Sequence, residues 1–176
     1  MDHSNLRYTD ERDKIYGLAG MAITLVALDG EKYLCEISLA APAGESIVMS
    51  HDYGFKGNPR MSARIVWEQT LADLRMTASM TLGNIVCRRY VLGHRGVADD
   101  DINPVREAVR ADASDHCGLD NDESDRLFDG CLSYVQRVFR HPGVQEVAHS
   151  FADHIGRRRT LSGAEAIEIL SSLGLS

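Results

Sequence analysis

The chain has 176 residues, which is enough for one domain with a hydrophobic core, and we expect residues 1–176 to form a single domain. Hydrophobic residues make up 44% of the sequence and charged residues 26%, so a disordered chain is not expected. The formal net charge of −7 argues against a general nucleic-acid or anionic-membrane binder, because both classes need a positive surface field.

The cysteines and the apolar stretches indicate the cellular location of the protein. The four cysteines (Cys35, Cys87, Cys117 and Cys131) include no closely spaced pair, which favours free thiols over a zinc site or a disulfide framework. The longest apolar stretch, Ile15 to Leu28, is shorter than the ~20 residues that span a bilayer. The first fourteen residues are acidic where a signal peptide needs positive charge. We therefore expect a cytoplasmic protein with no membrane partner and no cofactor.

A first helix is predicted to start at Thr9, followed by Asp10 and Glu11, and its apolar residues recur at steps of three and four from Ile15 to Leu28. Gly17 and Gly20 lie inside this helix, although each costs about 1 kcal/mol relative to alanine. Such a cost is tolerated where another backbone approaches closely. We expect a close helix contact at these glycines.

A β-hairpin follows, because residues 32–40 alternate between apolar and polar side chains and residues 46–50 hold a second β-branched run. Residues 41–45 between them contain proline and glycine, as a turn requires. Two strands alone are marginally stable, so the hairpin must lie on a helix or pair with another copy.

The next element is a long helix from Pro59 to about Leu92, with Asn58 as its cap. One apolar line along it comprises Trp67, Leu71, Leu74, Ala78, Leu82 and Ile85, and a second comprises Met61, Ile65, Ala72, Met76, Met80 and Cys87. A helix that is apolar over so much of its girth is packed on more than one side. We therefore expect a central helix that buries Trp67 together with the leucines.

About four shorter helices complete the predicted fold. Their expected starts are Asn103, Asn121, the residues after His141-Pro142, and Ser162, with an acidic connector at 99–101 and a loop at 112–120. The fold class is therefore α+β and predominantly helical: a helix, a β-hairpin, a long central helix, then about four shorter helices.

The segment 51–60 is the first candidate functional site, because it joins the hairpin to the long helix and is irregular. Its ligand-binding candidates are His51, Asp52, Tyr53, Lys56 and Arg60. The His51-Asp52 dipeptide resembles the metal-binding pair of HD-type phosphohydrolases. That family places the pair on a helix with further His and Asp ligands, which cannot be traced in this sequence. An ordinary connection between hairpin and helix is the alternative interpretation.

A second candidate is the pair His149 and Asp153, which are four residues apart and share one face of a predicted helix. They suit two ligands of one metal, or a simple surface hydrogen bond. The acidic region 112–125 does not fit the spacing of a calcium-binding EF-hand. The basic clusters Arg88–Arg89 and Arg157–Arg159 fit the C-terminal ends of helices, where positive charge is favourable.

No complete catalytic motif appears in the sequence. The first hypothesis for function is therefore a non-catalytic interaction or regulatory protein that acts as a homodimer, with nucleic acid an unlikely partner. The alternative is a metal-dependent hydrolase or a small-ligand-binding protein that uses the 51–60 loop.

Overall fold

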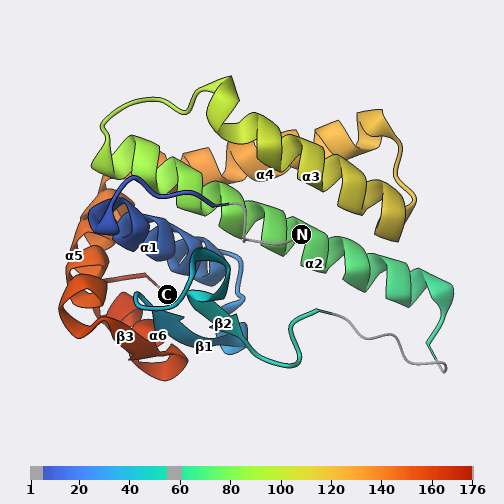
Figure 1. The fold of residues 1–176 in the computed structure, drawn as a ribbon. Coiled ribbons are helices and arrows are strands. Elements are labelled where there is room, and N and C mark those ends of the chain that lie inside the picture. Colours follow the sequence, from blue (N-terminus) through green and yellow to red (C-terminus); the bar gives the residue numbers. More distant parts are fainter. Residues whose placement is uncertain (1–5, 55–60, 176) are drawn as a thin grey trace.

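The computed structural model describes residues 6–54 and 61–175, and Figure 1 shows its arrangement. The elements are α1 (Glu11–Ala27), β1 (Leu34–Ser38), β2 (Ile47–Met49), α2 (Ala63–Val86), α3 (Asp99–Cys117), α4 (Asn121–Arg140), α5 (Pro142–Arg158), β3 (Thr160–Ser162) and α6 (Gly163–Ser172). A π-helical segment, η4 (Cys87–Leu92), continues α2 without a break. The predicted fold class is confirmed: the protein is predominantly helical α+β, in the expected order of helix, hairpin, long helix and four shorter helices.

The long helix α2 is central, as predicted. It lies between α1 on one side and α3 and α4 on the other, and it packs against all three (Figure 1). Leu74, Leu82 and Ile85 are buried on one side, and Met80 and Cys87 are fully buried on the other. Neither α2 nor any other helix within the described residues is long and apolar enough to cross a membrane.

The start of α2 differs from the prediction. The expected cap, Asn58, lies outside the described residues, and the helix begins at Ala63 with the Ser62 side chain accepting a hydrogen bond from the Ile65 N–H. Trp67 is 43% exposed, so the prediction that it is buried was wrong. Its indole N–H donates to the Cys117 carbonyl at 2.8 Å. Because α3 ends at Cys117, the indole is covered only in part.

The hairpin gains a third strand from the same chain. The strand order is β2-β1-β3, and both pairings are antiparallel, with Ile37 opposite Ile47 on one side and Leu161 on the other. The sequence analysis missed β3 because three residues between two helices carry no alternating pattern of their own. The sequence left open whether the hairpin lies on a helix or pairs with another copy, and within the chain itself β3 pairs with β1.

The acidic residues 99–101, which the sequence predicted to form a connector, make up the first turn of α3. The helix begins at Asp99, and the Asp101 carboxylate accepts a hydrogen bond from the Ala98 N–H. Three aspartates in a first turn are favourable because they face the positive end of the helix dipole. The expected start at Asn103 and the expected loop at 112–120 were therefore wrong, since α3 continues to Cys117 and ends at Gly118 with a φ of 65°.

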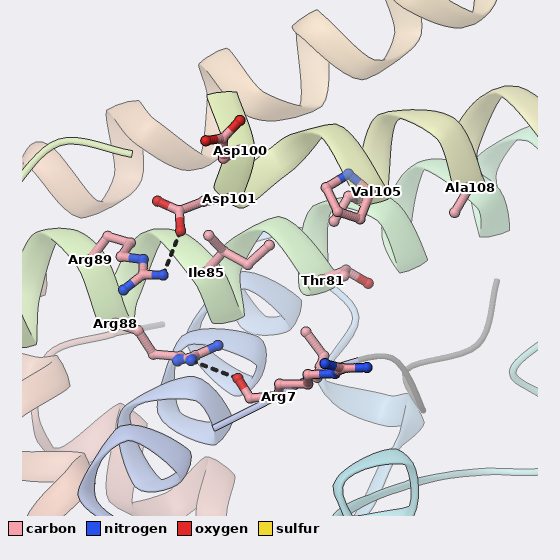
Figure 2. Close-up of a pocket in the computed structure, with 11 residues that line it drawn as sticks. Arg7, Thr81, Ile85, Arg88, Arg89, Asp100, Asp101, Val105 and Ala108 are labelled. Atoms are coloured by element: carbon pink, nitrogen blue, oxygen red, sulfur yellow. Dashed lines mark hydrogen bonds and ion pairs between the residues drawn. The ribbon is translucent and has the colours of Figure 1, made fainter. Parts of the chain in front are cut away.

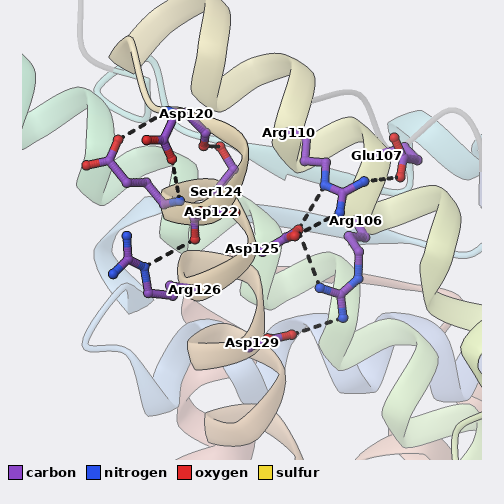
Figure 3. Close-up of polar contacts among 10 residues, drawn as sticks. Arg106, Glu107, Arg110, Asp120, Asp122, Ser124, Asp125, Arg126 and Asp129 are labelled. Atoms are coloured by element: carbon purple, nitrogen blue, oxygen red, sulfur yellow. Dashed lines mark hydrogen bonds and ion pairs between the residues drawn. The ribbon is translucent and has the colours of Figure 1, made fainter.

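Ion pairs hold α3 along α4 (Figure 3). Arg110 donates to both oxygens of Asp125 at 2.8 Å, and Arg106 donates to Asp129 at 2.9 Å. The hydrogen bond from Arg110 lowers the pKa of Asp125. The acidic region that failed as a calcium loop therefore serves in part to fix the position of α3.

The backbones of α1 and α2 approach closely where the two helices cross. A Cβ added to Gly20 would lie 2.2 Å from the Gly83 carbonyl oxygen, and one added to Gly83 would lie 2.1 Å from Thr24 Oγ1. The two backbones therefore touch, which confirms the close contact expected from the glycines of the first helix. Thr24 itself donates to the Gly20 carbonyl at 2.7 Å.

Truncation of the buried leucines of α2 tests the central position of this helix. Leu82→Ala removes a side chain with 0% exposure, and Leu74→Ala one with 8% exposure. Each should lower the free energy of unfolding by about 2–5 kcal/mol, because the change leaves a cavity. Urea denaturation measures the loss, with the exposed Glu68→Ala on the same helix as the control. A loss below about 1 kcal/mol in both leucine variants would contradict the buried position.

Candidate functional site

The structure places part of the 51–60 loop at the surface. His51 and Asp52 are exposed in a turn that follows β2. Lys56 and Arg60 lie outside the described residues. The structure therefore brings no pair of these candidates together within its described part, and a ligand-binding or hydrolase role for this loop stays a prediction.

Tyr53 is the one candidate of this loop that is anchored. Its hydroxyl hydrogen-bonds with Thr77 Oγ1 on α2, and its ring meets the edge of Tyr33 with centroids 5.6 Å apart. Burial raises the pKa of Tyr53, so the phenol is neutral at ordinary pH. These contacts give Tyr53 a structural role, which is to attach the end of the hairpin to the central helix.

His149 and Asp153 lie on α5, as the sequence predicted, and His149 has a protein partner. Its Nδ1 is 2.7 Å from the Tyr16 hydroxyl, and the two rings meet edge to face at 5.6 Å. Asp153 is exposed beside a shallow hollow that Tyr16 also lines. Within the described residues, no group of three His, Cys, Asp or Glu side chains could hold a metal ion. The hydrogen bond to Tyr16 joins α5 to α1, and a metal-binding role for His149 and Asp153 stays a prediction.

The most buried ion pair among the described residues contains Arg88, whose sequence pattern indicated only a helix end. Arg88 lies in η4, and its Nε donates to Asp13 Oδ1 on α1 at 2.7 Å. Its Nη2 donates to the other Asp13 oxygen, so the pair is bidentate. The two side chains are only 8% and 9% exposed. A buried ion pair of this kind is costly to break, because the remaining charge would be unpaired.

Arg88 also holds the N-terminal segment, residues 6–9, against the helices. Its Nη2 donates to the Arg7 carbonyl at 2.8 Å, and the Tyr8 ring lies 4.8 Å from the guanidinium carbon. The Tyr8 hydroxyl accepts from the Asn84 amide at 2.9 Å, and the Thr9 N–H donates to Asp13. One guanidinium therefore joins α1, η4 and the N-terminal segment.

A sequence signal for this cluster existed. Asp13, Gly17 and Gly20 follow each other at steps of four and three, so the acid lies on the same face of α1 as the two glycines. A Cβ added to Gly17 would lie 2.6 Å from the Asn84 amide nitrogen. An acidic residue on a glycine face predicts a buried partner on the crossing helix. The partner itself, 75 residues away, could not be chosen from the sequence.

The charge of Asp13 is maintained in spite of its burial. Burial by itself raises the pKa of this carboxyl group, whereas the hydrogen bonds from Arg88 and from the Thr9 N–H lower it. The hydrogen bonds outweigh the burial, and the pKa of Asp13 lies below its ordinary value. The ion pair is therefore fully formed at neutral pH.

A pocket of about 290 Å³ lies beside this cluster (Figure 2). It is bounded by the N-terminal segment, by α2 with η4, and by the first turns of α3. Its lining comprises Leu6, Arg7, Thr81, Ile85, Arg88, Arg89, Asp100, Asp101, Pro104, Val105 and Ala108. Arg89 donates to Asp101 across one end of the pocket, as the dashed line in Figure 2 marks. The structure thus gathers residues from three separate parts of the chain.

The helix widens where it borders this pocket. In η4 the Gly93 N–H donates to the Arg88 carbonyl five residues earlier, at 3.0 Å. A π-helical turn is rare and is found frequently at functional sites. Here it sets the direction of two consecutive arginines, one toward Asp13 and one toward Asp101.

An apolar surface at the start of α2 is a second feature with functional meaning. Among the described residues, the large hydrophobic side chains that are exposed are Val48, Met61, Ile65 and Trp67. Three of these four fall within the seven residues from Met61 to Trp67. At 3.6 residues per turn, Ile65 and Ala72 share one side of α2, and Met61 is exposed just before the helix begins. We name the surface of Met61, Ile65 and Ala72 the overhang face.

The comparisons with known proteins do not assign either feature. The sequence matches no protein-family model and no curated protein sequence.

Asp13→Asn tests the energetic weight of the buried ion pair. The variant leaves the Arg88 charge without its partner and should lower the free energy of unfolding at neutral pH by about 3–5 kcal/mol. Urea denaturation measures the change. Glu11→Gln is the matched control, because Glu11 pairs with Arg159 at the surface of the same helix and its loss should matter far less. Equal effects of the two variants would contradict the buried pair.

The same variant reveals the pH dependence of the pair. Because the pKa of Asp13 is lowered in the folded state, its contribution is complete above the unfolded value of about 3.9. The contribution is lost as the pH falls through the folded-state pKa. The stability difference between wild type and Asp13→Asn should thus be constant from neutral pH to about pH 5 and then shrink with acid. A stability difference between wild type and Asp13→Asn that grows on acidification would contradict a lowered pKa of Asp13 in the folded state.

Proposed function

We propose that the protein is a non-catalytic interaction protein that forms a homodimer through the overhang face of α2. The observation that carries this proposal is the exposure of the hydrophobic side chains Met61 and Ile65, at 38% and 43%, on the overhang face. Large apolar side chains that are exposed close together mark a site of interaction.

The overhang face is the continuation of a surface that the fold buries elsewhere. The line of Ile65 and Ala72 extends along α2 to Met76 and Met80. A Cβ added to Gly30, three residues after the end of α1, would lie 3.1 Å from Met76 Sδ. The first helix therefore reaches only to this point, and the turns of α2 before Met76 extend beyond it (Figure 1).

A second copy of the chain suits this face. Residues 61–72 carry one positive and one negative side chain, Arg64 and Glu68, so the face is neutral although the chain has a net charge of −7. The two side chains lie one turn apart on the same side of Ile65 and form an exposed pair at 2.8 Å. In a twofold contact each residue meets a symmetry-related surface, so Arg64 of one copy can face Glu68 of the other. An antiparallel pair of overhang faces is thereby self-complementary in shape and charge.

The oligomeric state tests this proposal. Light scattering or sedimentation should show the full chain as a dimer at high micromolar concentration, and Ile65→Lys should weaken the dimer at least about tenfold. Val48→Lys is the matched control, because Val48 is equally exposed, at 44% against 43%, on β2 away from the start of α2. A wild-type monomer at high micromolar concentration, or equal effects of the two lysine variants, would refute the overhang contact.

A further inference from the structure

We propose that the pocket between the N-terminal segment, η4 and α3 binds a small carboxylate with an apolar tail. This binding site is separate from the overhang face and does not depend on the proposed dimer. Its volume of about 290 Å³ is at the lower end of the range for ligand pockets. The lining is divided into an apolar wall and a set of guanidinium groups, and the two parts select the ligand.

The apolar wall comes from three parts of the chain. Ile85 of α2 and Val105 of α3 are buried and face the pocket, and Leu6 of the N-terminal segment packs against the same core. Pro104 and Ala108 complete this wall along α3. Ala108 is half-buried and has a small side chain, so the space in front of it is open to a tail rather than filled by the protein. Such a wall favours a hydrocarbon group over a polar one.

The guanidinium groups provide more hydrogen-bond donors than the neighbouring carboxylates accept. Arg88 uses most of its N–H groups on Asp13, Asn84 and the Arg7 carbonyl. Arg89, in contrast, uses a single N–H on Asp101 among its contacts within the described residues. The Arg7 side chain is exposed and has no side-chain hydrogen bond or ion pair to another described residue. Two guanidinium groups that line the pocket therefore retain donors for a ligand.

The carboxylates of the pocket are less available than the arginines. One Asp101 oxygen accepts from Arg89, and the other accepts from the Ala98 N–H at 3.2 Å. Asp13 lies behind Arg88 and is saturated by it and by the Thr9 N–H. Asp100 stands at the rim near the start of α3, outside the ion pair (Figure 2). The balance of free donors over free acceptors favours an anion, and guanidinium groups match the geometry of a carboxylate.

The position of the pocket links the ligand to the N-terminal segment. Leu6 and Arg7 form one wall, and this segment is held to the helices mainly through Arg88 and Tyr8. A bound carboxylate that contacts Arg7 from the pocket side adds a further attachment. Ligand binding is therefore expected to stabilise the folded chain by mass action and to hold the N-terminal segment against the helices.

Calorimetric titration of the full chain tests the site, with octanoate as the probe. Octanoate should bind and raise the thermal midpoint, whereas octylamine and octanol, which share its tail, should bind at least about tenfold more weakly because they lack the carboxylate. Arg7→Gln should weaken octanoate binding about tenfold, and Ala108→Phe should abolish it by filling the space of the tail. Arg126→Gln, an exposed arginine on α4, is the control and should leave binding unchanged.

The outcomes separate this site from general adsorption to apolar surface. Octanoate binding that is equal to that of octylamine, or that survives both Arg7→Gln and Ala108→Phe, would place the probe elsewhere and overturn the proposal. Absence of octanoate binding to the wild type would also overturn it. The thermal midpoint of each variant without the probe shows whether it folds, and Arg7→Gln, at an exposed position, keeps the test decisive if Ala108→Phe does not fold. None of these results depends on whether the chain is a dimer.

Discussion

The contact between Gly20 and Gly83 is the constraint on which the rest of the structure depends. With no side chain at either position, the backbones of α1 and α2 touch, and only glycine permits this distance. The approach brings Asp13 within reach of Arg88 and leaves no room for water between them. It also fixes α2 so that one side faces α1 while the other receives α3 and α4. The ion pair then selects the register of the crossing, because a shift of either helix by one turn would separate the two charges.

Local patterns predicted most of the fold because they act within a few residues. Two helix starts were predicted from local signals and are present in the structure. They are the capping box of Ser162 and Glu165 at α6 and the His141-Pro142 pair at α5. The spacing of Leu74 and Leu82 likewise identified a buried side of α2. Trp67 belongs to the same line, but its burial depends on where α3 ends, and this is a property of another part of the chain. The strand β3 was missed for a similar reason, since only its pairing with β1 defines it.

The candidate sites depend even more on contacts between distant parts of the chain, which local sequence patterns do not predict. The sequence drew attention to His51 and Asp52 because reactive side chains stand together there, yet the structure leaves them on the surface. Arg88 and Arg89 looked like ordinary residues of a helix end, and their importance comes from Asp13 and Asp101, to which the fold brings them. A pocket is formed by surfaces that are distant in sequence, so composition and spacing cannot reveal it. The sequence showed the overhang face as part of an apolar line. It did not show the point along α2 beyond which α1 no longer covers that line.

The place of β3 in the sheet has a consequence for biosynthesis. The hairpin strands end at Met49, and their third partner begins at Thr160, about 110 residues later. At a translation rate of about 5–20 residues per second, the ribosome needs roughly 5–20 s to deliver that partner. During this interval one edge of β1 has no strand beside it, and unpaired edges invite pairing with other nascent chains. The sheet can therefore be completed only after residues 160–162 have been synthesised, and until then this edge of β1 is open.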